Sequence, residues 1–174
     1  EQIVKNTEYI SRSIDRMEHQ INNVLDFVRV KPLKIEKISV QELIDDCLDG
    51  MKIPKDIVIK KPEKDIKINC DKEQFLILMY NVIFNAVQKL VDKGSITITF
   101  ESNDHENIIE VQDSGEAIPE NIIKKIFEPL FTTKHKGTGL GLSSCKQIIE
   151  EHNGTIHAEN NPTSFVIKIP KEVT

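Results

Sequence analysis

The chain has 174 residues, of which 39% are hydrophobic and 29% are charged, a balance typical of a folded globular protein. It carries 23 Lys and Arg against 28 Asp and Glu, a net charge of −5, so a general nucleic-acid binder, which needs a basic surface, is not expected. No apolar run reaches the roughly 18 residues that a membrane-spanning helix needs.

Residues 1–30 carry the heptad pattern of a helix that pairs with other helices. With Thr7 filling one gap, positions spaced alternately by three and four are apolar, and they are Ile3, Ile10, Ile14, Met17, Ile21, Val24 and Val28. We expect this helix to support a homodimer in the full protein, and an amphipathic helix folded on its own domain is the alternative. His19 falls on the outer side of the heptad and is expected at the surface.

Pro32 ends this helix, because its ring removes a backbone donor, and residues 31–38 are predicted to form a charged linker. Ser39 and Glu42 then have the spacing of a capping box, which predicts a helix reaching Asp49. We therefore divide the chain into a helix over 1–30, a linker over 31–38 and one globular domain over 39–174.

Hydrophobic periodicity predicts the remaining elements of that domain. Strands are predicted at 56–61, 65–70, 95–100, 107–112, 155–160 and 164–169. Helices are predicted at 71–92, 119–126 and 140–152, with a turn at Lys93 and Gly94 and a long loop over 128–139. Mixed helices and antiparallel strands indicate an α+β fold, a two-layer α/β sandwich with helices on one face of a sheet.

A polar stripe runs along the predicted helix over 71–92. Its members are Gln74, Asn81, Asn85 and Gln88. Asn is unfavourable inside a helix, and its amide oxygen is a hard neutral ligand suited to Mg²⁺, while its NH₂ group can reach a phosphate. A solvated surface stripe is the alternative.

Asp113 follows a predicted strand and precedes Gly115 by two residues. An ionised carboxylate accepts hydrogen bonds without donating any, so it suits the amino group of adenine rather than a phosphate. A plain turn is the alternative.

Residues 132–142 combine a basic cluster with glycines immediately before a helix. Glycines let the backbone approach an anion, and a helix N-terminus offers free N–H groups, so a phosphate site is predicted. The segment matches neither a Walker loop nor a dinucleotide-binding fingerprint. A flexible hinge is the alternative.

In this order the three features resemble the ATP-binding domain of sensor histidine kinases, in the group that includes gyrase, Hsp90 and MutL. The resemblance rests on four motifs: the asparagine box (81–86), the first glycine box (113–119), the phenylalanine box (127–134) and the second glycine box (137–142). It covers residues 39–172 and implies a Bergerat-type ATP-binding fold. Residues 1–30 resemble the second helix of the kinase dimerisation hairpin.

The resemblance implies ATP and Mg²⁺ as cofactors. It places Mg²⁺ on Asn85 with Asn81 in support, the adenine amino group on Asp113, and the base against Ile118. The implied ATP-binding residues are Asn81, Asn85, Gln88, Lys89, Asp113, Gly115, Ala117, Ile118, Phe127, Thr132, Thr133, Lys134, Gly137, Thr138, Gly139, Leu140, Gly141, Leu142 and Ser164. Of these, Thr132, Thr133 and Lys134 belong to a lid over the nucleotide.

The sequence departs from the family pattern at three points. Ala117 replaces a glycine, and Gln88 replaces a common Lys whose charge Lys89 or a lid lysine would supply. The phosphoacceptor motif of His, an acidic residue and Pro is absent, which places the acceptor His on a helix preceding this chain. The implied function is autophosphorylation followed by relay to the receiver domain of a response regulator, and a catalytically weak binding and docking module is the alternative.

Asn81 also stands where the hydrolases of the group carry a catalytic Glu, so poor water activation is expected. The chain begins at Glu1 with neither an initiator Met nor a signal-peptide pattern, and we expect a cytoplasmic piece of a longer protein whose membrane anchoring is open. The three cysteines are expected to be buried thiols, and they are Cys47, Cys70 and Cys145. Four histidines are expected at the surface rather than in a metal cluster, and they are His105, His135, His152 and His157.

Overall fold

A computed structural model describes residues 7, 32–91, 93–134, 137–160 and 162–171. Apart from Thr7, the predicted pairing helix over 1–30 lies outside the described residues, and so do His19, His135 and Lys136. Among the described residues, no helix has both the length and the apolar character that crossing a bilayer requires.

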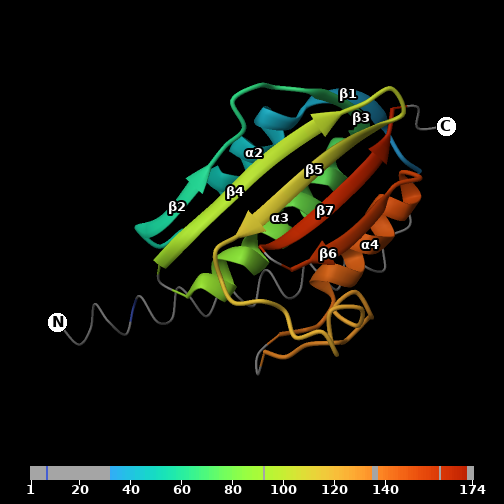
Figure 1. Ribbon diagram of the computed structural model, residues 1–174. Coiled ribbons are helices and arrows are strands. Elements are labelled where there is room, and N and C mark those ends of the chain that lie inside the picture. Colours follow the sequence, from blue (N-terminus) through green and yellow to red (C-terminus); the bar gives the residue numbers. More distant parts are fainter. Residues whose placement is uncertain (1–6, 8–31, 92, 135–136, 161, 172–174) are drawn as a thin grey trace.

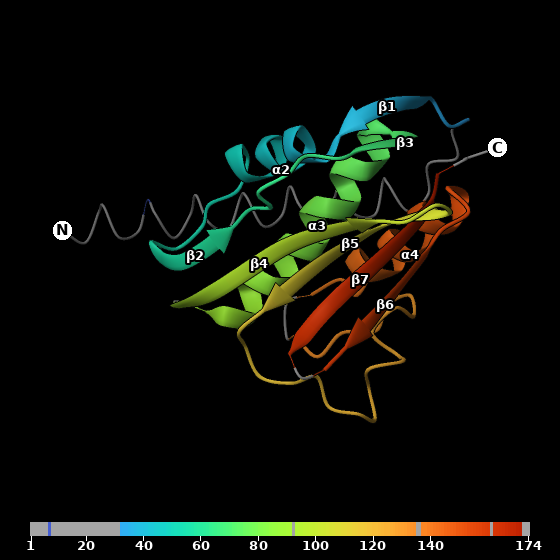
Figure 2. The ribbon, with the colours of Figure 1, turned by 45° about the horizontal axis from the view of Figure 1, so that its top comes forward.

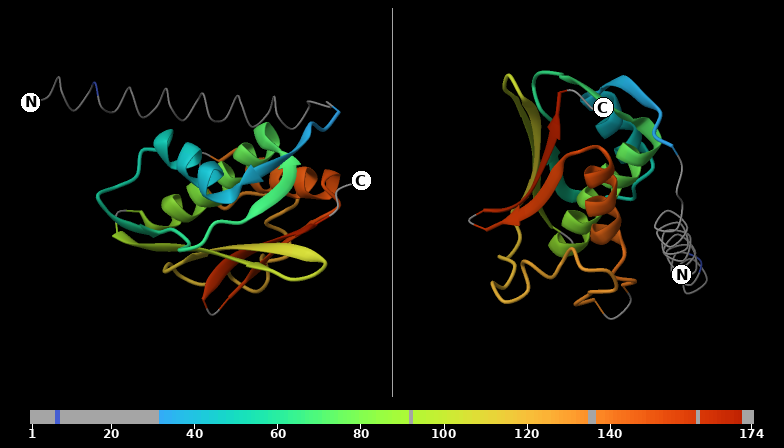
Figure 3. Two further views of the ribbon diagram at one scale, coloured as in Figure 1. Left: turned by 90° about the horizontal axis from the view of Figure 1, so that it is seen from above. Right: turned by 90° about the vertical axis from the view of Figure 1, so that its right-hand side faces the viewer.

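The domain is built from one five-stranded sheet with helices packed on one face, which confirms the predicted α+β two-layer sandwich (Figures 1 and 3). In spatial order the strands are β2 (Asp56–Lys60), β4 (Lys93–Ser102), β5 (Glu106–Asp113), β7 (Thr163–Pro170) and β6 (Thr155–Glu159). The helices are α2 (Val40–Asp49), α3 (Lys72–Leu90) and α4 (Gly141–Glu151). The β2–β4 pair is parallel and the other pairs are antiparallel.

Strict alternation along β5 fixes which side chains meet the helices. Every second residue of the strand is buried, ending with Val111 and Asp113. α3 supplies the opposite wall of the core, where Phe75, Leu78 and Met79 are fully buried, each worth roughly 1.5–3 kcal/mol of hydrophobic stabilisation. The same alternation that builds the core therefore turns the Asp113 carboxylate inward, toward α3.

A second, two-stranded sheet closes the top of the helical layer. It pairs β1 (Ile35–Ser39) with β3 (Lys67–Asp71) in antiparallel fashion. Residues 35–38, expected to be a linker, thus form most of a strand. The Ser39 hydroxyl accepts a hydrogen bond from the Glu42 amide at 3.1 Å, as the capping box predicts.

His152 is buried, so the prediction of a surface histidine was wrong at this position. Its side chain is fully enclosed, with Nδ1 2.8 Å from the Ile148 carbonyl oxygen and Nε2 accepting from the Asp71 amide at 3.0 Å. Because Nε2 accepts, Nδ1 carries the proton and donates to Ile148. The ring also meets Phe75 edge-on at 5.0 Å, so it connects the end of α4 to the start of α3.

Two other predicted elements differ from the structure. Residues 119–126 form successive turns rather than a helix, with bonds from Ile122 and Ile123 to the Pro119 carbonyl. Lys93 and Gly94 begin β4 instead of forming a turn, since pairing with β2 extends the strand backward. Cys47 and Cys70 are free buried thiols, as predicted, and burial raises the pKa of each to about 12.

Replacing Asp71 with Asn is expected to remove a pH-dependent part of the stability. Burial raises the pKa of Asp71, but hydrogen bonds from the Lys34 and Gln74 amides outweigh this and hold the pKa below its ordinary value of 3.8. A lowered folded pKa means that the carboxylate stabilises the fold above the unfolded pKa, and that this contribution is lost as the pH falls through the folded pKa. Urea unfolding at pH 7 should show a loss of about 1 kcal/mol in Asp71→Asn.

Urea unfolding at lower pH provides the control, because the loss of stability in Asp71→Asn should shrink below about pH 4. A deficit of constant size from pH 7 to pH 2 would mean that the carboxylate charge contributes nothing and that only the cap geometry matters.

Candidate functional site

The predicted site residues gather at one end of the sandwich. Figure 2 shows the segment between β5 and α4 extending from the edge where β5 ends and β7 begins. Asp113 ends β5, the amide stripe lies on α3, and the glycine-rich loop leads into α4. Segments distant in sequence therefore border one region.

Asp113 places a buried carboxylate at one end of this region. The residue is 1% exposed, and Oδ1 accepts a hydrogen bond from the Gly115 amide at 2.8 Å. Lys89 Nζ lies 2.9 Å from the same oxygen. A Cβ on Gly115 would lie 2.8 Å from Oδ1, so only glycine lets the backbone fold back onto the carboxylate. Lys89 thus pairs with Asp113 rather than supplying charge elsewhere.

From Asn81 to Gln88, the amide side chains of α3 become more exposed along the helix. Asn81 is only 2% exposed, which excludes the alternative of a wholly solvated stripe, while Asn85 is half-buried and Gln88 exposed. Lys134 Nζ donates to Asn85 Oδ1 at 2.9 Å and to Gln88 Oε1 at 2.6 Å. Two amide oxygens therefore converge on one cation, a donor set of the kind that Mg²⁺ accepts.

Lys134 is the lid lysine that comes closest to the α3 amides in the described part of the loop. Partial removal of its ammonium group from water lowers the pKa of Lys134. Within the same loop, Thr132 Oγ1 accepts from the Lys134 amide at 3.1 Å and the Gly137 amide donates to the Lys134 carbonyl at 3.1 Å. These bonds shape the turn that carries the ammonium group to α3.

The glycine-rich loop is packed against the start of the lid. Gly139 has φ +69°, and a Cβ there would lie 2.4 Å from the carbonyl carbon of Leu130. Thr138 Oγ1 accepts from the Leu140 amide at 3.4 Å. Gly139 is therefore required both by its backbone conformation and by close packing.

Helix α4 begins differently from the two preceding helices. Ser39 caps α2 and Asp71 caps α3 through side-chain oxygens, whereas Leu140 offers α4 no side-chain cap. Behind the glycine-rich loop, the first turn of α4 accordingly presents backbone donors of the kind that bind anions.

An apolar wall completes the region. Phe127 meets Phe165 edge-on at 6.3 Å, and Ser164, 2% exposed, lies beside Gln112 in the β5–β7 register. Ile118 is half-buried and packs against the core. Ala117 and Thr133 are exposed.

Sequence reasoning missed Asn160. Its side chain accepts from the Ile118 amide at 2.9 Å and donates to the Ile118 carbonyl at 2.8 Å, so it clamps that backbone in place. The contact spans 42 residues, and an Asn in a turn between strands carries no local sign of it. Leu130 lies within the phenylalanine box, but the packing of Gly139 against its backbone was not predicted.

Residues 70–173 match the family described as histidine kinase-, DNA gyrase B- and HSP90-like ATPases. Sporulation kinase A of Bacillus subtilis is 44% identical over 157 residues, which cover 88% of this chain but only 25% of that kinase. The chain thus spans about a quarter of the length of this curated relative.

Two solved structures show the same fold. The catalytic domain of histidine kinase ThkA superposes with a TM-score of 0.72 at 36% identity, covering 79% of this chain and 98% of that one. Histidine kinase ThkA in complex with response regulator protein TrrA gives a TM-score of 0.75 at 29% identity, covering 99% and 52%. The chain belongs to the histidine kinase-, DNA gyrase B- and HSP90-like ATPase family, and within it to the catalytic ATP-binding domains of histidine kinases.

Proposed function

We propose that this domain binds ATP with Mg²⁺ and presents the γ-phosphoryl group to a His on the dimerisation hairpin of its full-length protein. The observation that carries the proposal is the uncapped first turn of α4 behind Gly139. Free N–H groups and the positive end of the helix dipole suit a polyphosphate.

Asp113 would accept the adenine amino group at the opposite end of the site. Its carboxylate is buried and already held in place by the Gly115 amide and by Lys89. Ile118, fixed by Asn160, would pack on the base, with Phe127 and Ser164 bordering the same region. A base held at Asp113 would extend its phosphates toward the glycine-rich loop.

Asn85 would hold Mg²⁺, with Asn81 supporting it from one helical turn earlier. The fit rests on the convergence of Asn85 and Gln88 oxygens upon the Lys134 ammonium group. When bound, Mg²⁺ neutralises charge on the phosphate oxygens. Because Lys134 uses the same Asn85 oxygen, the lid lysine must release it, and we propose that its charge then turns to the phosphates.

Transfer, rather than hydrolysis, follows from the chemistry of position 81. A buried amide has no basic group with which to activate water. Phosphoryl transfer needs mainly positioning and charge neutralisation, which α4, Asn85 and Lys134 would provide. The phosphoryl group would pass next to the receiver domain of a response regulator, a step supported by the solved complex of ThkA with the response regulator TrrA. We propose homodimerisation through residues 1–30.

The deciding experiment supplies the missing acceptor. The chain is incubated with radiolabelled ATP, Mg²⁺ and a separately produced dimerisation hairpin that contains the acceptor His, with a His→Gln hairpin as control. Label is expected on the hairpin that contains the acceptor His and not on the His→Gln control. ATP binding without any label transfer would favour the catalytically weak docking module, and hydrolysis that Asn81→Ala abolishes would contradict the role given to position 81.

Asn85→Ala is expected to weaken the dependence of ATP binding on Mg²⁺. Losing one metal ligand should reduce the Mg²⁺-induced gain in affinity by about tenfold, equivalent to about 1.4 kcal/mol. Calorimetric titration with ATP, with and without Mg²⁺, measures this gain.

Asn69→Ala, on β3 and away from the site, is the matched control and should retain the full Mg²⁺ effect. An unchanged Mg²⁺ effect in Asn85→Ala would place the metal elsewhere.

A further inference from the structure

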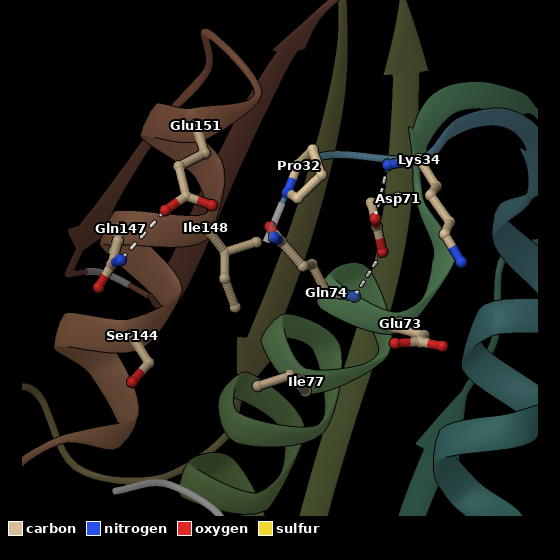
Figure 4. Close-up of a pocket in the computed structure, with 10 residues that line it drawn as sticks. All are labelled: Pro32, Lys34, Asp71, Glu73, Gln74, Ile77, Ser144, Gln147, Ile148 and Glu151. Atoms are coloured by element: carbon tan, nitrogen blue, oxygen red, sulfur yellow. Dashed lines mark hydrogen bonds between the residues drawn. The ribbon is translucent and has the colours of Figure 1, made fainter. Parts of the chain in front are cut away.

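A cavity of about 310 Å³ lies outside the nucleotide region, between the first half of α3 and the face of α4 (Figure 4). The segment beginning at Pro32 closes one side of it, and Ile77 and Ile148 form apolar walls. None of its lining residues is among the implied ATP-binding residues, although Gln74 belongs to the polar stripe predicted from the sequence and lies here instead. Its size is at the lower end of the range for small-molecule sites.

Two buried oxygen atoms of the lining residues have no hydrogen-bond partner within the described part of the chain. They are Gln74 Oε1 and Ser144 Oγ. Ser144 is only 3% exposed, and the Gln74 side chain reaches from α3 toward α4 beside Pro32 and Ile148 (Figure 4). A buried polar atom left unpaired costs roughly 1–3 kcal/mol, so the Gln74 oxygen calls for a donor inside the cavity.

The charged residues around the cavity favour a positively charged hydrogen-bond donor. Its lining carries Asp71, Glu73 and Glu151 against Lys34, a net charge of −2. Asp71 stays ionised, since amide hydrogen bonds hold its pKa below the ordinary value. Glu151 accepts one bond from Gln147 at 3.1 Å. An anion would be repelled, whereas a cation would meet carboxylates and the unpaired Gln74 oxygen.

We propose that this cavity binds a guanidinium or ammonium group carried on a short aliphatic stem. The head group donates to Gln74 Oε1, and the stem lies against Ile77 and Ile148. The occupant would bridge the first half of α3 and the middle of α4. These are the two helices whose other ends border the proposed nucleotide site.

One ligand chemistry has two possible sources here. A free small cation is one. The other is the chain itself, because Arg29 and Lys31 precede Pro32 in the sequence, outside the described residues. The test must therefore separate a site open to added cations from one that the chain fills itself.

Butylguanidinium is titrated into the full 174-residue chain and into the double variant Arg29→Ala/Lys31→Ala, while the amide resonances of residues 74 and 144 are followed by NMR. Binding to both proteins would identify a free small cation as the occupant of the cavity. Binding only to the double variant would identify the chain's own basic residues as the occupant. In either case butylurea, a neutral analogue, and pentanoate should bind at least tenfold more weakly.

Two substitutions check the contacts, each made in whichever protein binds the probe. Gln74→Leu should weaken butylguanidinium about tenfold, the fold-change that corresponds to about 1.4 kcal/mol. Glu151→Gln should weaken it too, while Glu101→Gln, exposed on β4, should not. Glu151 is exposed, so Glu151→Gln tests the proposal even if Gln74→Leu fails to fold.

Some outcomes overturn the proposal. Absence of binding to both proteins means that the cavity holds water only. Equal binding of butylurea or pentanoate would show that charge does not select the ligand. Unchanged affinity in Gln74→Leu and Glu151→Gln would place the probe elsewhere on the surface.

Discussion

Asp113→Asn is expected to weaken ATP binding by about 100-fold, the largest loss from a single site residue. The carboxylate is 1% exposed, so a hydrogen bond to it is shielded from water. Hydrogen bonds to charged groups contribute roughly 1.5–3 kcal/mol, and an Asn presents an NH₂ donor toward another donor in one of its orientations. The substitution also removes the charge that Lys89 pairs with, leaving that ammonium group without its partner.

Calorimetric titration of ATP and GTP into both proteins measures this effect. The parent should prefer ATP, and Asp113→Asn should lose most of that preference. Asp104→Asn, in the exposed turn between β4 and β5, changes the same charge and should leave binding unchanged. Full ATP affinity and selectivity in a folded Asp113→Asn protein would remove Asp113 from base recognition.

Gly139→Ala is expected to have the next largest effect, lowering ATP affinity by about 30-fold without unfolding the domain. A left-handed conformation costs an alanine roughly 1–2 kcal/mol, and the added Cβ would collide with the Leu130 carbonyl carbon. Since the neighbour is backbone, the loop must shift as a unit and move the first turn of α4 away from the phosphates. The loop lies outside the sheet–helix core, so the melting temperature should change little.

Gly50→Ala provides the matched control. Gly50 ends α2 with φ −85°, and the atoms nearest to an added Cβ lie at 3.9 and 4.0 Å, so alanine fits there. Thermal melts of both variants, together with ATP titrations, separate loss of binding from loss of fold. A Gly139→Ala protein with parental ATP affinity would show that the loop does not shape the phosphate site.

The layers of the fold and the order of the motifs could be predicted from the sequence because both depend on local signals. Alternation along 107–112 marked the strand that ends at Asp113, and capping at Ser39 marked α2. The enclosure of His152 could not be predicted in this way. It depends on the Asp71 amide, 81 residues away, and on contacts made only when α4 packs on α3.

The partners of the two lysines in the candidate site could not be predicted from the sequence either. Sequence reasoning left Lys89 and a lid lysine as alternatives for the charge missing at Gln88. The structure pairs Lys89 with Asp113 and brings the lid lysine, Lys134, to Gln88, across 46 residues. Both lysines have long flexible side chains, so their partners are set by the three-dimensional arrangement of loop and helix rather than by spacing along the chain.

The uncapped start of α4 makes the order of one helical turn depend on what is bound. Without an anion, the amides of residues 141–143 should exchange hydrogen with water readily, as frayed helix ends do. With a polyphosphate in place they should become protected, and the stiffened turn runs directly into Ser144, on the face of α4 that lines the acidic cavity. Binding at the phosphate site would then change the rigidity of α4 without displacing the helix axis.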